Sequence, residues 1–367
     1  MSYFCNSPFN SIWVNVDGYV KTCCAGSYYL GNLYENTLDG IMHNGKLEFI
    51  QQEILNGKIP GYCSGCVESE ELIGSSQRSY YRQFADTGQF VLKSVDIRWN
   101  ETCNIACTYC NEKFSSKWAK KKAIPITVRK PYHNDLLSFL VTNASEMEAI
   151  MLAGGEPLMH KEMLPFIQAL PKDTKIDVMT NLGVDFSNYP YANELLSRFT
   201  FFNASIENTE KHCEYVRNGI SWQTVLDNIA KVKEQNKQIT FLSLYNIFSC
   251  TKLLDLIKFV HANNTSVTWQ NLMYPEHLQV FKFSDKVKAL AIAELDRCME
   301  YLNENNMNND TTSFVNTTKE SLISSLGKTE SVDKLFVEYI VNFEEKYNTS
   351  EHKFSELWPE LWSVLNG

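Results

Sequence analysis

Three cysteines fall within eight residues of this chain, in the stretch Cys103-Asn-Ile-Ala-Cys107-Thr-Tyr-Cys110. The run 94–99 before them alternates between polar and apolar residues, which predicts a strand, and 100–102 predicts the turn that leaves it. The three thiols are therefore expected on a loop at the C-terminal end of a strand, where α/β barrels place their chemistry.

Clustered thiolates of this kind can bind metal. Three of them can hold three irons of a cubane iron–sulfur cluster and leave the fourth iron open to a bound molecule. Zinc is the alternative, although structural zinc sites usually have four ligands in two spaced pairs. A disulfide between cysteines of one short loop would be strained.

Composition excludes several classes of protein. The 367 residues exceed one typical domain, and a hydrophobic fraction of 44% is ordinary for a protein with a core. The net charge of −9 argues against a broad nucleic-acid-binding surface. Without a membrane-spanning apolar run or a signal-peptide pattern at 1–5, a cytoplasmic location is expected, with no membrane association. In that reducing compartment, eleven cysteines are expected to be metal ligands rather than disulfides.

The N-terminal segment carries a second group of cysteines. Strands at 12–16 and 19–22 are predicted around an Asp17-Gly18 turn, so that Cys5 enters the hairpin and Cys23 leaves it. A helical segment with apolar spacing between 38 and 55 follows and leads to the pair Cys63 and Cys66. Four cysteines brought together in two pairs could hold either zinc or a cluster.

Cys24 is a further cysteine of this segment. Adjacent residues of a strand point to opposite faces, so only one of Cys23 and Cys24 is expected to face a shared site. The resemblance of the spacing from Gly18 to that of a known cluster-binding module favours Cys23, and Cys24 is expected to be a small buried residue.

Between 94 and 275, strand-like and helix-like segments alternate, which predicts right-handed βαβ units and a parallel sheet. The predicted strands are 94–99, 148–153, 175–180, 199–206, 239–246 and 266–273, and the predicted helices are 133–143, 161–170, 190–198, 222–236 and 251–263. Six units rather than eight predict a partial (β/α)6 TIM-like barrel, open enough for a large substrate.

The remaining segments complete the predicted α/β organisation. A small cysteine-rich α+β module at 1–75 and a connector at 76–93 precede the barrel at 94–275, and a helical C-terminal segment follows at 276–367. Within that last segment, the Asn- and Thr-rich stretch 303–318 predicts a loop.

Polar residues follow several predicted strands. Gly154-Gly155-Glu156-Pro157 comes after the second strand, where two glycines allow a ligand to approach the backbone closely and the glutamate adds an anionic acceptor. Asn181 follows the third strand, and Ser205 and Glu207 end the fourth, with Arg217 further on.

The triplet spacing, with Tyr109 just before the last cysteine, resembles the signature of the radical S-adenosylmethionine (SAM) enzymes. The resemblance implies that Cys103, Cys107 and Cys110 hold a 4Fe–4S cluster whose open iron binds the methionine moiety of SAM. It implies that Tyr109 packs near the adenine. The residues expected to contact SAM are Gly154, Gly155, Glu156 and Pro157 at its amino group, Ser205, Glu207 and Arg217 at its ribose and carboxylate, and Asn181 as a further cofactor-binding residue.

A second resemblance concerns the N-terminal segment. The spacing of Cys5, Gly18 and Cys23, the phrase Leu30-Gly31-Asn32-Leu33 and the pair Cys63-x2-Cys66 are similar to the SPASM module of radical SAM proteins, or to its shorter form, called twitch. This likeness implies an auxiliary 4Fe–4S cluster held by Cys5, Cys23, Cys63 and Cys66. In related families the module usually follows the barrel, whereas here it precedes it.

Together the resemblances imply an enzyme that cleaves SAM to a 5′-deoxyadenosyl radical and abstracts hydrogen from a substrate. A flavodoxin or ferredoxin-type protein is the expected electron donor. The expected substrate is a ribosomally made peptide that is crosslinked or epimerised, and the alternative is a small molecule such as a carbohydrate or a nucleotide. A non-catalytic zinc-binding protein is the least favoured hypothesis, because it leaves Gly154-Gly155-Glu156 unexplained.

Overall fold

The computed structural model describes residues 4–73, 76–84, 89–127, 129–307, 310–327 and 330–367. Small parts of the predicted N-terminal module, connector and C-terminal loop lie outside these ranges, namely 1–3, 74–75, 85–88 and 308–309. The chain divides into two compact units. The first comprises 1–102, 126–179 and 186–201, and the second comprises 103–125, 180–185 and 202–367.

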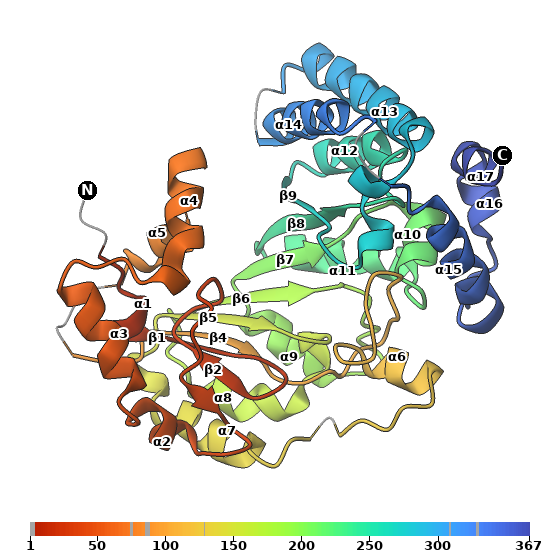
Figure 1. Ribbon diagram of the computed structural model, residues 1–367. Helices are drawn as coiled ribbons and strands as arrows, with labels where there is room; N and C mark the ends of the chain where they lie inside the picture. The colour runs from red at the N-terminus through yellow and green to blue at the C-terminus, as the bar shows by residue number, and fades with distance from the viewer. Residues whose placement is uncertain (1–3, 74–75, 85–88, 128, 308–309, 328–329) are drawn as a thin grey trace. The chain divides into compact units, whose positions relative to one another are not determined.

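The first unit contains a mixed sheet with the strand order β3-β2-β1-β4-β5-β6 (Figure 1). Its strands are β1 (Ser11–Val14), β2 (Tyr19–Lys21), β3 (Gly31–Asn32), β4 (Ser94–Arg98), β5 (Ala149–Ala153) and β6 (Lys175–Thr180). The pairs β1–β2 and β2–β3 are antiparallel, whereas β1–β4, β4–β5 and β5–β6 are parallel.

The N-terminal hairpin is part of this sheet. Strand β1 pairs with β4 in a register that places Trp13 opposite Asp96, and the predicted turn between β1 and β2 has Gly18 at a φ of 76°. Since β1 runs parallel to β4, Cys5 before β1 and Cys23 after β2 both lie toward the amino ends of the parallel strands. Gly154 directly follows β5 and therefore lies at the carboxyl ends of the parallel strands, opposite to the two cysteines.

Helices accompany this sheet along the chain. They are α1 (Ser7–Asn10), α2 (Leu38–Met42), α3 (Lys46–Leu55), α4 (Ser64–Ile73), α5 (Gln77–Tyr81), α7 (His133–Thr142), α8 (Leu164–Ala169) and α9 (Tyr191–Arg198). The predicted helical segment between 38 and 55 is split into α2 and α3 at Gly45, whose φ is 82°. On the sheet, Val95, Ile97, Ile150 and Leu152 are buried, which gives the unit its core.

The second unit continues with parallel βα structure. It contains β7 (Phe201–Ser205), β8 (Gln238–Tyr245) and β9 (Ser266–Asn271), in the order β7-β8-β9. The first residue of β7 is assigned to the first unit and the rest of the strand to the second. Strands β8 and β9 are parallel along their whole paired length. The accompanying helices are α6 (Ser116–Lys121), α10 (Glu210–Val216), α11 (Trp222–Glu234) and α12 (Leu253–Ala262). The predicted α/β class is confirmed, and neither strand order closes into a barrel within the described residues.

The chain ends in helices, as predicted: α13 (Asp285–Glu304), α14 (Asp310–Ser324), α15 (Asp333–Lys346), α16 (Phe354–Leu357) and α17 (Pro359–Asn366). The predicted loop at 303–318 is wrong from Asp310 onward, where α14 begins. Thr311, Val315, Thr318 and Leu322 are all buried and recur at helical spacing. Packing of this face, with α14 against α13, outweighs the weak helix propensity of Asn and Thr.

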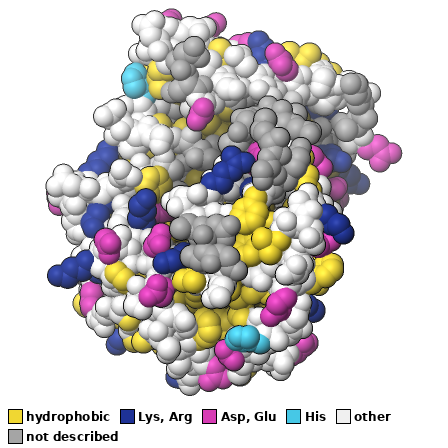
Figure 2. Space-filling model, turned by 90° about the vertical axis from the view of Figure 1, so that its left-hand side faces the viewer, with side chains coloured by type: hydrophobic (Ala, Val, Ile, Leu, Met, Phe, Trp, Pro, Cys, Tyr) yellow, Lys and Arg dark blue, Asp and Glu magenta, His cyan; other side chains and the backbone are white. Residues whose placement is uncertain are grey.

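Two surface properties follow from the structure. Within the ranges that it describes, no helix is both long and apolar enough to cross a membrane. On the face drawn in Figure 2, acidic and basic side chains are interspersed, so charge of one sign is not gathered over that face.

His133, at the start of α7, is held in its neutral form by hydrogen bonds to both ring nitrogens. The backbone N–H of Lys130 donates to Nδ1 at 3.2 Å, so Nε2 carries the proton and donates to the carbonyl of Trp99 at 3.0 Å. The side chain is buried, and burial lowers its pKa to about 4. Protonation of Nδ1 would break the bond to Lys130, so His133 has a structural role.

This histidine makes stability depend on pH. Because its pKa is lower in the folded chain, the unfolded chain binds the proton first, and stability is lost as pH falls from about 6.5 toward 4, by about 1.4 kcal/mol per pH unit at most. Between pH 7.5 and pH 5.5, the thermal unfolding midpoint of wild type should therefore fall by more degrees than that of His133→Gln. Equal losses in the two proteins would show that His133 does not carry this dependence.

Candidate cluster and cofactor sites

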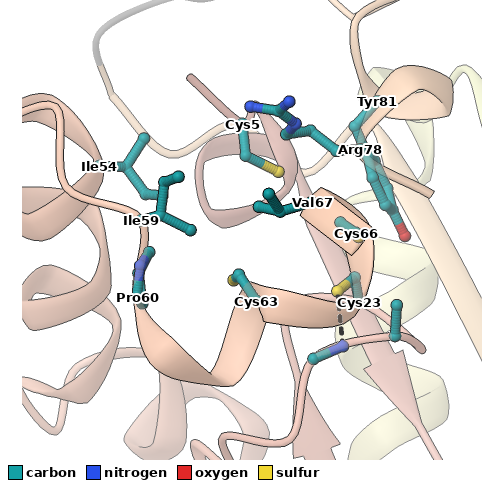
Figure 3. A pocket seen from close by; sticks show the side chains of 12 residues that line it. Cys5, Cys23, Ile54, Ile59, Pro60, Cys63, Cys66, Val67, Arg78 and Tyr81 are labelled. Atoms are coloured by element: carbon teal, nitrogen blue, oxygen red, sulfur yellow. Dashed lines mark hydrogen bonds between the residues drawn. The ribbon is translucent and has the colours of Figure 1, made fainter. Parts of the chain in front are cut away.

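The four N-terminal cysteines predicted as auxiliary ligands line one pocket of the first unit (Figure 3). Cys5 precedes α1 and Cys23 follows β2, while Cys63 ends a 3₁₀ turn and Cys66 lies in the first turn of α4. The pocket holds about 490 Å³ of empty space, part of it open to solvent. Four thiols around one pocket are the donor set that a 4Fe–4S cluster requires.

The electrostatics show that these thiols are neighbours. Burial raises the pKa of the Cys5 thiol to about 12, with smaller contributions from Cys23, Cys63 and Cys66. Burial also raises the pKa of Cys63 to about 12. Such thiols stay protonated at neutral pH until a metal displaces the proton. Among the described residues, no group of three or more His, Cys, Asp or Glu side chains is placed to hold a single metal ion.

The loop after Cys23 is fixed by its own hydrogen bonds. The N–H of Gly26 donates to Sγ of Cys23 at 3.2 Å, as the dashed line in Figure 3 shows. The ammonium of Lys21 donates to the carbonyls of Cys24 at 3.1 Å and Gly26 at 2.7 Å, and it lies 4.3 Å from the ring centroid of Trp13. Cys23 therefore faces the pocket, whereas Cys24 is not among the residues that line it and is half-buried rather than fully buried.

The three-cysteine loop belongs to the second unit and is held on several sides. The amides of Ala106 and Thr108 donate to carbonyls of the segment 216–218, each at 2.8 Å. The indole N–H of Trp118 donates to the carbonyl of Cys107 at 2.8 Å. This network fixes the backbone that carries the thiols.

Within the loop, each thiol has its own surroundings. Cys107 is buried, and burial raises its pKa, while the guanidinium of Arg217, with Nη1 3.9 Å from Sγ, acts in the opposite direction. Burial raises the pKa of Cys110 to about 12, and Cys107 adds to the effect. The amide nitrogen of Asn181 lies 3.9 Å from Sγ of Cys103. Three thiols on one fixed loop fit a cluster with three protein ligands.

Two of the residues predicted to contact SAM bind each other. Arg217 donates to both carboxylate oxygens of Glu207, from Nε at 2.9 Å and from Nη2 at 2.7 Å, and both side chains are buried. The guanidinium carbon also lies 5.8 Å from the ring centroid of Tyr109. This bidentate pair fixes a cation beside Cys107.

The remaining predicted residues of this unit are Asn181 and Ser205. Asn181 donates to Oδ1 of Asn104 at 2.9 Å and accepts from the N–H of Gly183 at 2.6 Å. Its side chain thus connects the segment that follows β6 to the loop that carries the three cysteines. Ser205 ends β7 and is half-buried.

Gly154-Gly155-Glu156-Pro157 belongs to the first unit. Gly154 and Gly155 have φ values of 82° and 48°. A Cβ on Gly155 would lie 2.2 Å from the carbonyl oxygen of Thr102, the residue before Cys103. The close approach predicted at these glycines is thus made at Gly155 by the chain's own backbone at Thr102.

Glu156 is fully buried at this turn. Its N–H donates to the carbonyl of Thr102 at 2.7 Å, and its carboxylate accepts from the N–H of Leu158 at 3.1 Å. That second bond caps the short 3₁₀ turn that begins at Pro157. The turn is thus tied to Thr102, in the segment that follows β4.

Sequence reasoning missed Arg78 and Tyr81, which line the four-cysteine pocket. Both fall in the stretch 76–93, which the sequence predicts to be a connector. No spacing rule marks them, and the usable signal was only that charged and aromatic residues gather there. Their placement depends on tertiary contacts that one sequence does not display.

The two thiol sets fit iron–sulfur clusters, and the chain that carries them has a largely parallel α/β fold. The sequence profile of the radical SAM superfamily matches residues 97–248, and that of the SPASM iron–sulfur cluster-binding domain matches residues 5–67. The chain therefore carries a radical SAM domain at 97–248, preceded by an N-terminal cluster-binding domain at 5–67. Both domains imply 4Fe–4S clusters, and the first implies SAM as a cofactor. The non-catalytic zinc hypothesis is thereby set aside.

Solved structures give weaker likenesses. Native anSMEcpe with bound AdoMet is 16% identical, with 59% of this chain and 61% of that chain covered and a TM-score of 0.42. SuiB of Streptococcus suis bound to S-adenosylmethionine is 12% identical, with 74% and 61% covered and a TM-score of 0.42. The chain thus spans about three fifths of these proteins. A search of curated proteins gave no match.

Proposed function

We propose that this chain is a cytoplasmic radical SAM enzyme that abstracts hydrogen from a ribosomally made peptide and so crosslinks, epimerises or similarly modifies it. The observation that carries the proposal is the presence of two thiol sets of different size. One is a fixed loop with three cysteines, and the other is a pocket with four. A set of three leaves an iron open for SAM, whereas a set of four leaves none open.

In this proposal Cys103, Cys107 and Cys110 would hold the first cluster, which when bound would supply the one electron that cleaves SAM to methionine and a 5′-deoxyadenosyl radical. Cys5, Cys23, Cys63 and Cys66 hold the auxiliary cluster, whose chemistry is electron relay. A flavodoxin or ferredoxin-type protein donates the electron. The chain's own part is to fix the cofactor and exclude water around the reacting hydrogen.

The other predicted residues have positioning roles in the proposal. Arg217, oriented by Glu207, keeps a cation beside Cys107. Tyr109, Asn181, Ser205 and the turn Gly154–Pro157 contact SAM. The corresponding domains are the auxiliary module at 1–75, the connector at 76–93, the radical SAM core at 94–275 and the helical extension at 276–367.

A peptide substrate is favoured by the last strand of the sheet. Strand β9 ends the strand order of the second unit, and the side chains of Thr268, Gln270 and Asn271 on it are exposed, whereas Trp269 packs against α14. An exposed edge strand can pair with the backbone of an extended peptide, while its alternate side chains provide selectivity. A small carbohydrate or nucleotide has no backbone to pair there, and it is the second candidate.

Iron analysis tests the cluster assignment. The anaerobically reconstituted wild type should contain about eight irons, and the variant with Cys5, Cys23, Cys63 and Cys66 replaced by alanine should contain about four. That variant should still form 5′-deoxyadenosine but should not complete product formation, because the relay is lost. An unchanged iron content would show that these four cysteines hold no cluster.

The substrate class needs a direct assay. Wild type would be incubated with SAM, dithionite and separate pools of peptides, carbohydrate alcohols and nucleosides. The proposal expects a mass change only in the peptide pool: loss of hydrogen for a crosslink, or one deuterium gained in D₂O for epimerisation. A product found only among the carbohydrates or nucleosides would replace the peptide with a small molecule.

A further inference from the structure

Arg78 is a charged side chain at the four-cysteine pocket. It lies in α5, is only 6% exposed and lines the pocket, and Figure 3 shows its guanidinium beside Cys5. It interacts electrostatically with Cys5, Cys63 and Cys66. Among the described residues that line this pocket, Arg78 is the only Lys, Arg, Asp or Glu.

A carboxylate holds this guanidinium in place. Arg78 donates from Nε to Oε1 of Glu70 at 2.9 Å and from Nη2 to Oε2, which makes the pair bidentate. The hydroxyl of Ser76, the N-cap of α5, donates to the same carboxylate. Such fork geometry fixes the position of the charge as well as its presence.

The anchor and one cysteine share a helix. Glu70 follows Cys66 by four residues in α4, so the two lie on the same side of that helix. The helix that supplies a thiol to the pocket therefore also supplies the carboxylate that positions Arg78. The guanidinium and the thiols are fixed relative to each other through one short element.

A fixed cation at this position has a redox consequence. A 4Fe–4S cluster with four thiolates is anionic, and reduction adds one more negative charge. A nearby cation stabilises the more negative form, and it does so more strongly where water is excluded. Removal of the charge should therefore make reduction less favourable.

We propose that Arg78 is a positioning residue that raises the reduction potential of the auxiliary cluster, and that Glu70 holds it in place. The inference rests on the proposed four-cysteine cluster. In this inference, a residue that is not a cluster ligand sets the reduction potential that drives the electron relay.

The test uses the full chain with Cys103, Cys107 and Cys110 replaced by alanine, so that one cluster remains. Iron content is measured first, and the potential is then measured by redox titration followed by electron paramagnetic resonance. Arg78→Gln, Arg78→Lys and the double variant Glu70→Gln/Arg78→Gln are compared with this parent. Arg82→Gln is the matched control, because Arg82 is exposed and lies 4.0 Å from the same carboxylate.

Arg78→Gln is expected to lower the equilibrium constant for reduction at least tenfold, which is about 59 mV for one electron. Arg78→Lys should restore part of the loss, and Arg82→Gln should behave like the parent. The double variant should show a smaller loss than Arg78→Gln, because it also removes the negative charge of Glu70 that the single variant leaves unpaired.

Two results would overturn the inference. Unchanged potentials in Arg78→Gln and in the double variant, with iron still at about four per chain, would remove the tuning role. Loss of iron from both variants would mean that Arg78 only holds the site together. A parent without iron would instead contradict the proposed auxiliary cluster itself.

Discussion

Replacement of Cys107 by alanine is expected to abolish SAM cleavage, with 5′-deoxyadenosine formation falling to background. Cys107 is buried in the middle of the fixed three-cysteine loop, and Arg217 lies beside its sulfur. A cluster that already has only three protein ligands loses a third of them in this variant. Iron should fall from about eight to about four per chain, because the four-cysteine pocket is untouched.

Cys213 provides the matched control. It is also buried, and it lies close enough to Cys107 for the two thiols to interact electrostatically. It belongs to α10 rather than to the loop. Cys213→Ala should therefore keep both the iron content and the formation of 5′-deoxyadenosine, measured by mass spectrometry. If Cys107→Ala still forms that product, the assignment of the three-cysteine loop is wrong.

Gly155→Ala is expected to destabilise the chain by about 2–5 kcal/mol, from a positive φ and an overlap with backbone. The new Cβ would lie 2.2 Å from the carbonyl oxygen of Thr102 and 2.8 Å from its carbonyl carbon. Neither atom can move as a side chain can. The backbone at Thr102, in the segment after β4, would have to shift, and the loop that begins at Cys103 follows Thr102 directly in the chain.

Gly57→Ala separates the two causes. Gly57 also has a positive φ, of 71°, but a Cβ there would meet nothing within 4 Å. It should cost only about 1 kcal/mol, the conformational part of the penalty. Thermal midpoints and SAM binding would be measured for both variants. Equal midpoints would show that the turn at Gly155 adjusts without cost.

Local features of the fold were predictable because they depend on short-range patterns. The strands that carry the core alternate or run apolar, and the Asp17-Gly18 turn connects its hairpin as expected. The loop that carries the three cysteines was predictable for the same reason, because all three lie within eight residues of the sequence.

The rest depends on long-range contacts. The pairing of β1 with β4 joins residues about eighty positions apart, and hydrogen-bonded partners between strands leave no mark in composition. The anchoring of Arg78 by Glu70 and of Arg217 by Glu207 likewise requires side chains to meet after folding. The helix α14 shows the reverse case, where a buried face overrides residues that favour loops when taken singly.

The parallel pairing of β1 with β4 has a consequence for how the N-terminal module can be exchanged or removed. Without the hairpin, β4 would end the sheet and present a row of unpaired backbone groups beside the buried Val95 and Ile97. Exposed strand edges of this kind recruit other chains and promote aggregation. The cysteine-bearing hairpin thus also covers the edge of β4. A shortened chain without it would need another segment to cover the same edge.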